Sequence, residues 1–98
     1  MPWNVQLEDE SGKVLAQVVA VSGFLPAFGN EGFPMLRFVD PWGDTVFNRD
    51  QLTPVMEEWA RLREAAEKAG QLDEWEAVER LARRCQSEVH TYIKFVGD

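Results

Sequence analysis

The sequence is poor in the residues on which many catalytic and metal sites depend. It contains one cysteine, Cys85, and one histidine, His90, in 98 residues. A single cysteine excludes an internal disulfide and is typical of a reducing compartment, so we expect a cytoplasmic protein. A single histidine excludes metal sites built from several histidines.

Long apolar runs and phosphate-binding glycine motifs are also missing. No stretch approaches the ~20 apolar residues of a transmembrane helix. The opening MPWNVQLEDE has neither the basic nor the apolar region of a secretory signal. The chain has no GxGxxG, phosphate-loop or GxSxG pattern. We therefore predict no membrane association and no cofactor, and whether the protein is an enzyme stays uncertain, with the pattern leaning against it.

Positive charge is scarce, because ten lysines and arginines face seventeen acidic residues and leave a net charge of −7. Residues 50–79 hold nine of the acids and only three basic residues. Such a surface repels phosphate backbones, so we predict no nucleic-acid binding, and it attracts basic proteins. Glu57, Glu58 and Glu64 are the predicted acidic partner face. The alternative is a solvated helical surface that aids solubility.

The second half of the chain has the apolar spacing of helices. Thr53 and Pro54 are typical of a helix start, and apolar residues follow at every third or fourth position as far as Gly70, which predicts a helix over 54–69. Asp73 begins a second helical pattern. The linker between the two is short, so we expect an antiparallel helical hairpin with Trp59 and Trp75 in its core.

Strand patterns precede and follow these helices. Residues 3–7 alternate apolar and polar side chains, and a turn at 9–12 leads into a nearly continuous apolar run over 13–21. That run predicts a central strand buried on both faces. Two further runs, 35–40 and 45–47, flank Asp-Pro-Trp-Gly-Asp and predict a tight β-hairpin.

These patterns predict one α+β domain spanning residues 1–98. Residues 91–96 alternate again and supply a final C-terminal strand. The expected architecture is a two-layer sandwich. Its sheet has about five mostly antiparallel strands, and the C-terminal antiparallel helical hairpin packs on one face.

Aromatic residues gather in a glycine-rich loop over residues 22–34 and at the following turn. The candidate ligand or interface residues are Phe24, Leu25, Phe28, Phe33 and Trp42. Exposed aromatic side chains in a loop favour a binding surface or a pocket for a hydrophobic ligand. The alternative is that the loop folds over the sheet and completes the core.

Catalytic and metal chemistry have weak candidates. Cys85 lies on the apolar stripe of the second helix, which is typical of an inert core thiol, and His90 follows five residues later. Oxygen-bearing side chains between Asp40 and Asp50 do not match a calcium-loop spacing, and turn formation explains them. We therefore predict no catalytic residues and no metal site.

Two segments carry a resemblance. DPWGDTVFN (40–48) and YIKFVGD (92–98) resemble small uncharacterised bacterial single-domain proteins, which have no activity to transfer. In size and charge the chain is also similar to toxin-immunity proteins and mobile gene-cassette products. The acidic helical face and the aromatic loop predict a non-catalytic cytoplasmic protein-protein interaction module, immunity- or antitoxin-like or a mobile gene-cassette product. The expected partners are a basic protein and a second copy in a homodimer. The alternative is a small hydrophobic-ligand-binding protein with a pocket under the 22–34 loop.

Overall fold

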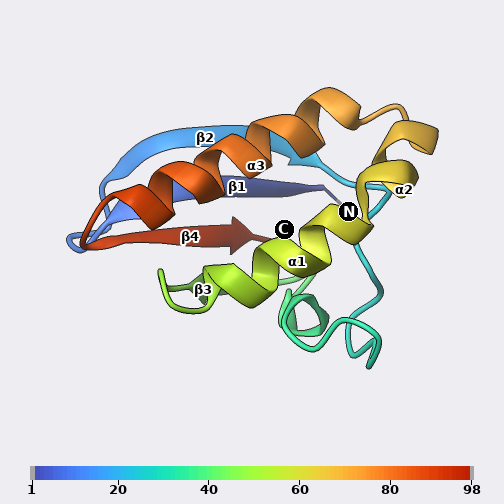
Figure 1. Ribbon diagram of the computed structural model, residues 1–98, viewed down its shortest axis with the longest axis horizontal. Helices are drawn as coiled ribbons and strands as arrows, with labels where there is room; N and C mark the ends of the chain where they lie inside the picture. Colours follow the sequence, from blue (N-terminus) through green and yellow to red (C-terminus); the bar gives the residue numbers. More distant parts are fainter. Residues whose placement is uncertain (1, 98) are drawn as a thin grey trace.

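Two layers make up the structure, a four-stranded antiparallel sheet and three helices packed on it (Figure 1). The computed structural model describes residues 2–97. The strands are β1 (Trp3–Asp9), β2 (Val14–Val21), β3 (Asp44–Phe47) and β4 (Thr91–Val96), and the helices are α1 (Leu52–Arg61), α2 (Arg63–Lys68) and α3 (Leu72–Ser87). The predicted α+β class is confirmed.

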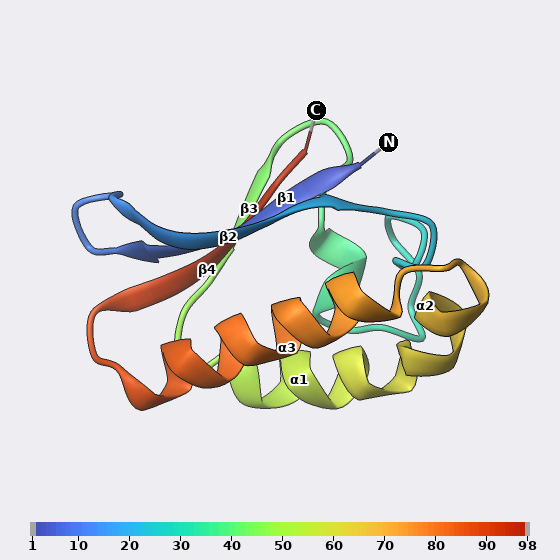
Figure 2. The ribbon, with the colours of Figure 1, turned by 90° about the horizontal axis from the view of Figure 1, so that it is seen from above.

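The sheet has the order β2-β1-β4-β3, so β1 and β4 are its central strands. Cross-strand pairs Val5–Phe95 and Leu7–Ile93 point into the core, where all four side chains are buried. The residues between them face the other side of the sheet because strand side chains alternate. The helices lie on one side only, which leaves that second face uncovered (Figure 2).

The predicted hairpin between β1 and β2 is confirmed. Asp9 Oδ1 accepts hydrogen bonds from the Ser11 hydroxyl (2.7 Å), the Ser11 amide (2.9 Å) and the Lys13 amide (3.0 Å). The Ser11 hydroxyl, followed by the Lys13 amide, holds the pKa of Asp9 below its ordinary value. Gly12 completes the turn at φ 88°, a conformation that favours glycine.

The prediction of β2 as a central strand buried on both faces is wrong. β2 is an edge strand, and two irregularities in its pairing with β1 leave extra residues on β2. Ala20, at the second of them, has φ 58°. β2 packs against α3, and the helices lie on one side of the sheet only (Figure 2). Its continuous apolar composition therefore does not correspond to continuous burial.

The predicted strand over 35–40 is also wrong, and the sheet has four strands rather than about five. Leu36–Phe38 forms a short 3₁₀ helix, η1, and β3 pairs with β4 instead. The Asp-Pro-Trp-Gly turn itself is present, since Asp40 Oδ1 accepts from the Trp42 amide (2.8 Å). The Gly97 amide donates to Gly43 O (2.8 Å), which fastens this turn to the end of β4.

The single helix predicted over 54–69 is divided into α1 and α2 at Leu62. Its start also differs, because Thr53 lies inside α1 and makes no capping hydrogen bond. Asn48 and Gln51 instead bond reciprocally, with Asn48 Oδ1 accepting from the Gln51 amide (2.9 Å) and Gln51 Oε1 from the Asn48 amide (2.8 Å). This is the geometry of a capping box whose first residue, Asn48, lies five positions before the expected cap, Thr53.

Trp59 in α1 and Trp75 in α3 hold these two helices together by reciprocal hydrogen bonds, and both are buried as predicted. Trp59 Nε1 donates to Trp75 O (3.1 Å), and Trp75 Nε1 donates to Trp59 O (2.8 Å). Trp59 O also accepts from the Leu62 amide (2.9 Å), a tightened i to i+3 bond where α1 ends. The Trp75 indole therefore donates to the carbonyl of α1 at which the regular i to i+4 hydrogen bonding of that helix is interrupted.

We expect Trp59→Phe and Trp75→Phe each to lower the free energy of unfolding by about 1–3 kcal/mol, because each removes an indole donor from a buried carbonyl. The losses should couple in the double variant by at least about 0.5 kcal/mol. Urea denaturation measures these values. Trp42→Phe, at an exposed position, is the control and should have little effect. Strictly additive losses would contradict a cooperative role of the two reciprocal hydrogen bonds.

Candidate functional site

The most exposed aromatic side chains lie on three connected segments beside β3. Phe28, Phe38 and Trp42 are 63%, 55% and 70% exposed. The Gly29 amide donates to Arg37 O (2.8 Å), which joins the 22–34 loop to η1. The Thr45 hydroxyl donates to Phe38 O (3.2 Å) and accepts from the Asp40 amide (3.1 Å), which joins η1 and the turn to β3. We call Phe28, Arg37, Phe38 and Trp42 the aromatic patch.

Arg37 gives this patch a cation without a carboxylate partner. Its guanidinium carbon lies 4.6 Å from the centre of the Phe38 ring. Its Nε is enclosed by protein and has no hydrogen-bond partner, and Arg37 forms no ion pair within residues 2–97. Arginine beside exposed aromatic rings is typical of residues that dominate protein interfaces.

The five predicted ligand or interface residues separate into two groups. Phe24 is buried, with its ring edge-on to Trp59 at 5.4 Å, and Leu25 and Phe33 are half-buried against the core. Phe28 and Trp42 are exposed. The interpretation of the loop as a core cover therefore holds for the first group, and the interpretation as an exposed surface holds for the second.

Sequence reasoning did not place Arg37 and Phe38 among the candidate interface residues. The alternation over 35–40 suggested a strand, which would have turned Leu36 and Phe38 to the same face. In η1, Leu36 is buried while Phe38 is exposed. The signal that could have found them is the proline at 34, which favours a break in regular strand structure.

The loop phenylalanines do not line one common pocket. Phe24 points into the core and Phe28 into solvent, so they have different surroundings. Phe33 lies under the Arg61 guanidinium at 4.3 Å, and Arg61 Nη1 donates to Gly32 O (2.7 Å). The hollow nearest the loop has a different lining: Pro34, Met35, Pro54, Glu57, Glu58 and Arg61.

Glu58 was predicted to belong to the acidic partner face, and this is wrong. Its residue surface is only 6% exposed. Its carboxylate accepts from the Met35 amide (3.0 and 3.1 Å to its two oxygens) and from the Leu36 amide (2.9 Å). These amides begin η1 and would otherwise lack partners, so the α1 side chain caps a helix that is distant in sequence.

Glu57 and Glu64 are exposed, as an acidic partner face requires. Glu64 pairs with Lys68 (3.1 Å) on the surface of α2. Exposed pairs of this kind contribute little to stability. The carboxylates of Glu57 and Glu64 are therefore available to a partner, whereas that of Glu58, which lies between them in the sequence, is not.

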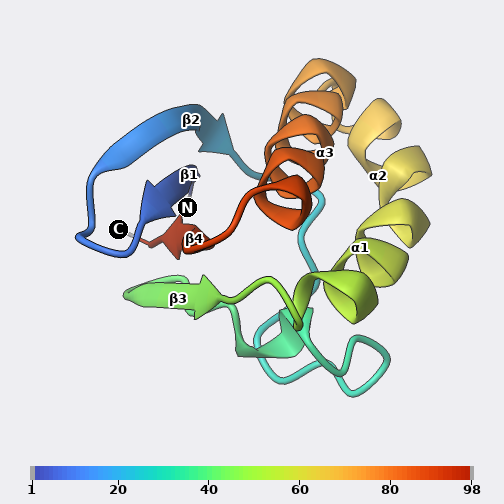
Figure 3. The ribbon, with the colours of Figure 1, turned by 60° about the vertical axis from the view of Figure 1, so that its left-hand side comes forward.

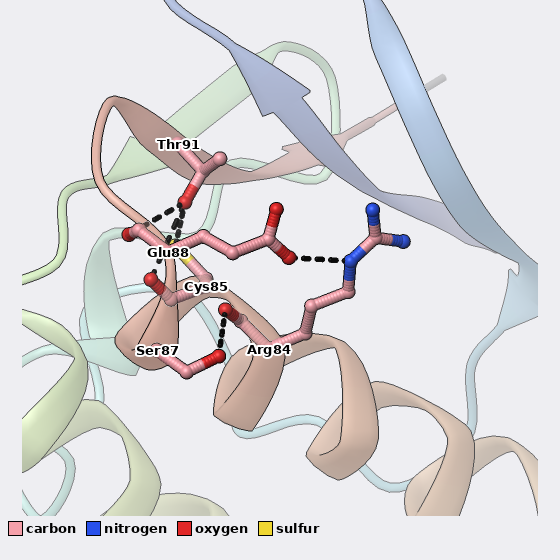
Figure 4. A network of polar contacts seen from close by, with 5 residues as sticks. All are labelled: Arg84, Cys85, Ser87, Glu88 and Thr91. Atoms are coloured by element: carbon pink, nitrogen blue, oxygen red, sulfur yellow. Dashed lines mark hydrogen bonds and ion pairs between the residues drawn. The ribbon is translucent and has the colours of Figure 1, made fainter.

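Cys85 and His90 do not form a catalytic pair. Figure 4 shows the Thr91 hydroxyl beside Cys85 Sγ, Cys85 O and Glu88 O, each at 3.3 Å, where α3 turns into β4. Arg84 Nε and Glu88 Oε2 pair beside them at 2.6 Å. His90 lies instead beside Glu10, with 3.3 Å between Nδ1 and Oε2. Burial raises the pKa of the Cys85 thiol, which disfavours the reactive thiolate.

Within residues 2–97 no three histidine, cysteine or acidic side chains are grouped to hold a metal ion. Asp44 pairs with Lys94 at 3.4 Å, and Asp40 caps its own turn. None of the helices in this range is long and apolar enough to cross a membrane.

No protein-family model, curated protein or solved structure matches this chain.

We expect Glu58→Ala to lower the free energy of unfolding by about 2–4 kcal/mol, because the Met35 and Leu36 amides lose their acceptor. Glu57→Ala removes an exposed carboxylate from the adjacent position and is the matched control, with an expected effect within about 0.5 kcal/mol. Urea denaturation compares the two. Equal losses would contradict the internal role of Glu58.

We expect Cys85 to resist alkylation by iodoacetamide in the native protein at pH 8 and to react once the protein is unfolded in urea. The buried thiol has a raised pKa, so less thiolate forms in the folded state, and the reagent has no access to Sγ. Mass spectrometry measures the modified fraction. Rapid alkylation without urea would contradict an inert core thiol.

Proposed function

We propose that the protein is a non-catalytic protein–protein interaction module that contacts its partner through the aromatic patch. The observation that carries this proposal is the exposure of Phe28, Phe38 and Trp42 on three bonded segments. Large apolar side chains in solvent lower solubility unless a partner covers them. Tryptophan, aromatic and arginine side chains together are also the usual composition of interface centres.

The backbone that presents this patch is held by the core. Glu58 anchors the start of η1, and Arg61 holds the loop at Gly32. Phe24 fixes the loop from below through Trp59. A surface that is ordered before binding loses less conformational entropy in the complex, which supports a binding role.

The acidic surface of α1 and α2 offers a second contact. Glu57 and Glu64 remain exposed there, and the net charge of −7 on the whole chain favours association with a basic partner by charge complementarity. This version corresponds to the immunity- or antitoxin-like role. It differs from the aromatic patch because its binding should weaken steeply with salt.

A hydrophobic-ligand-binding function has less support. Phe24 fills the core, and the nearby hollow, although lined mainly by apolar surface, is open to solvent and includes none of the loop phenylalanines. Apolar ligands favour enclosed sites with mostly apolar linings.

We expect Phe38→Ser with Trp42→Ala to reduce partner capture at least tenfold, a loss of about 1.4 kcal/mol or more. Quantitative mass spectrometry compares what wild type and variant retain from host extract. Val46→Ser is the control, since Val46 is also about half exposed but lies outside the patch. Proteins lost from the double variant and kept by the control are the partners.

Glu57→Lys with Glu64→Lys, measured in the same experiment, tests the acidic surface. If this variant loses the captured proteins while the aromatic variant keeps them, the patch is not the contact. If both variants and the wild type retain the same proteins, both versions of the interaction are contradicted. Thermal unfolding of each variant checks that the fold is retained.

A further inference from the structure

The two edge strands of the sheet, β2 and β3, differ in length and in how their outer sides are covered (Figure 3). β3 is four residues long, begins with a charged residue, and has the segment around Phe38 and Asp40 bonded to it through Thr45. β2 is eight residues long and pairs with β1 on one side only. On its other side, no described residue makes a hydrogen bond to the backbone of residues 14–19.

The outer edge of β2 has none of the side chains that usually prevent pairing, and its two irregularities lie towards its ends, at residues 14–16 and 18–21. Its sequence VLAQVVAV contains no charged residue, proline or glycine. Natural edge strands commonly carry a lysine or proline that prevents another strand from adding. Val14 and Val19 are 43% and 56% exposed on this strand. The composition therefore favours the addition of a further strand.

The free part of this edge has clear limits. At one end the Gln71 side chain accepts from the Ser22 amide (2.7 Å) and donates to Ala20 O (2.9 Å), which occupies the backbone there. Between the two irregularities the pairing with β1 is regular over residues 16–18. A further strand would therefore pair along residues 14–19, centred close to Gln17.

The uncovered face of the sheet is a poorer contact than this edge. Lys94 lies at its centre, 3.7 Å from Glu8 and 3.4 Å from Asp44. Packing a second sheet on this face would remove these charges from water at considerable cost. β2 itself carries no charged side chain, so pairing it with a second β2 brings no like charges on the two strands together.

We propose that two copies of the chain pair through β2, in antiparallel orientation, to form one continuous sheet. Two identical strands placed antiparallel are related by a two-fold axis, so each copy supplies the donors and acceptors that the other lacks. Gln17 of one copy then lies beside Gln17 of the second. Because strand pairing alone buries a small area, the dimer should dissociate on dilution. It leaves the aromatic patch free, since that patch lies beside the opposite edge.

Sedimentation velocity over a concentration series tests this dimer. Gln17→Lys and Gln17→Glu should each raise the dimer dissociation constant about tenfold, because like charges meet across the axis. Mixing the two variants should restore association, because each lysine then faces a glutamate. Val46→Lys, on the opposite edge strand, is the matched control and should leave the dissociation constant unchanged.

Amide hydrogen exchange gives an independent readout. Protection of residues 14–19 should rise with protein concentration, while the loops at 28–42 should not change. A wild type that stays monomeric at all concentrations overturns the proposal, as does a dimer that Val46→Lys dissociates and Gln17→Lys does not. A dimer that protects 28–42 in place of β2 also overturns it, whether or not the aromatic patch binds another protein.

Discussion

The contact that the rest of the structure depends on is the reciprocal bonding of Trp59 and Trp75. Each indole donates to the other's backbone carbonyl, so α1 and α3 are held in one register and neither buried indole N–H is left unpaired. The Trp59 ring also meets Phe24 and Phe95 edge-on. One side chain thus connects the helical layer, the sheet and the 22–34 loop.

This arrangement gives the acidic residues of α1 two different roles. Glu57 faces solvent, while Glu58, one position further along the helix, turns inward to the amides of η1. A helix places successive side chains about 100° apart, so adjacent residues with the same chemistry reach different environments. Residues of the same charge therefore serve as an internal cap and as an external surface, and only the latter can meet a partner.

Much of the fold follows from local chemistry. The Asp9 turn, the alternation in β1 and β4 and the apolar stripes of the helices depend on neighbouring residues, and each was predicted correctly. The candidate site was predicted less well. Trp42 and Phe28 were found because they lie in turns, whereas Arg37 and Phe38 were missed because η1 is stabilised by a carboxylate more than twenty residues away.

The sequence by itself determined the class of the fold, the helical character of residues 54–69 and of the segment after Asp73, and the surplus of negative charge, since periodicity and composition act over a few neighbouring residues. Only the tertiary structure decided that β2 lies at an edge, that Glu58 is internal and that Phe24 and Phe28 have opposite surroundings. These outcomes depend on strand order and on contacts between distant segments. An apolar residue seeks burial wherever it lies in the chain, and its neighbours in space decide whether burial is reached.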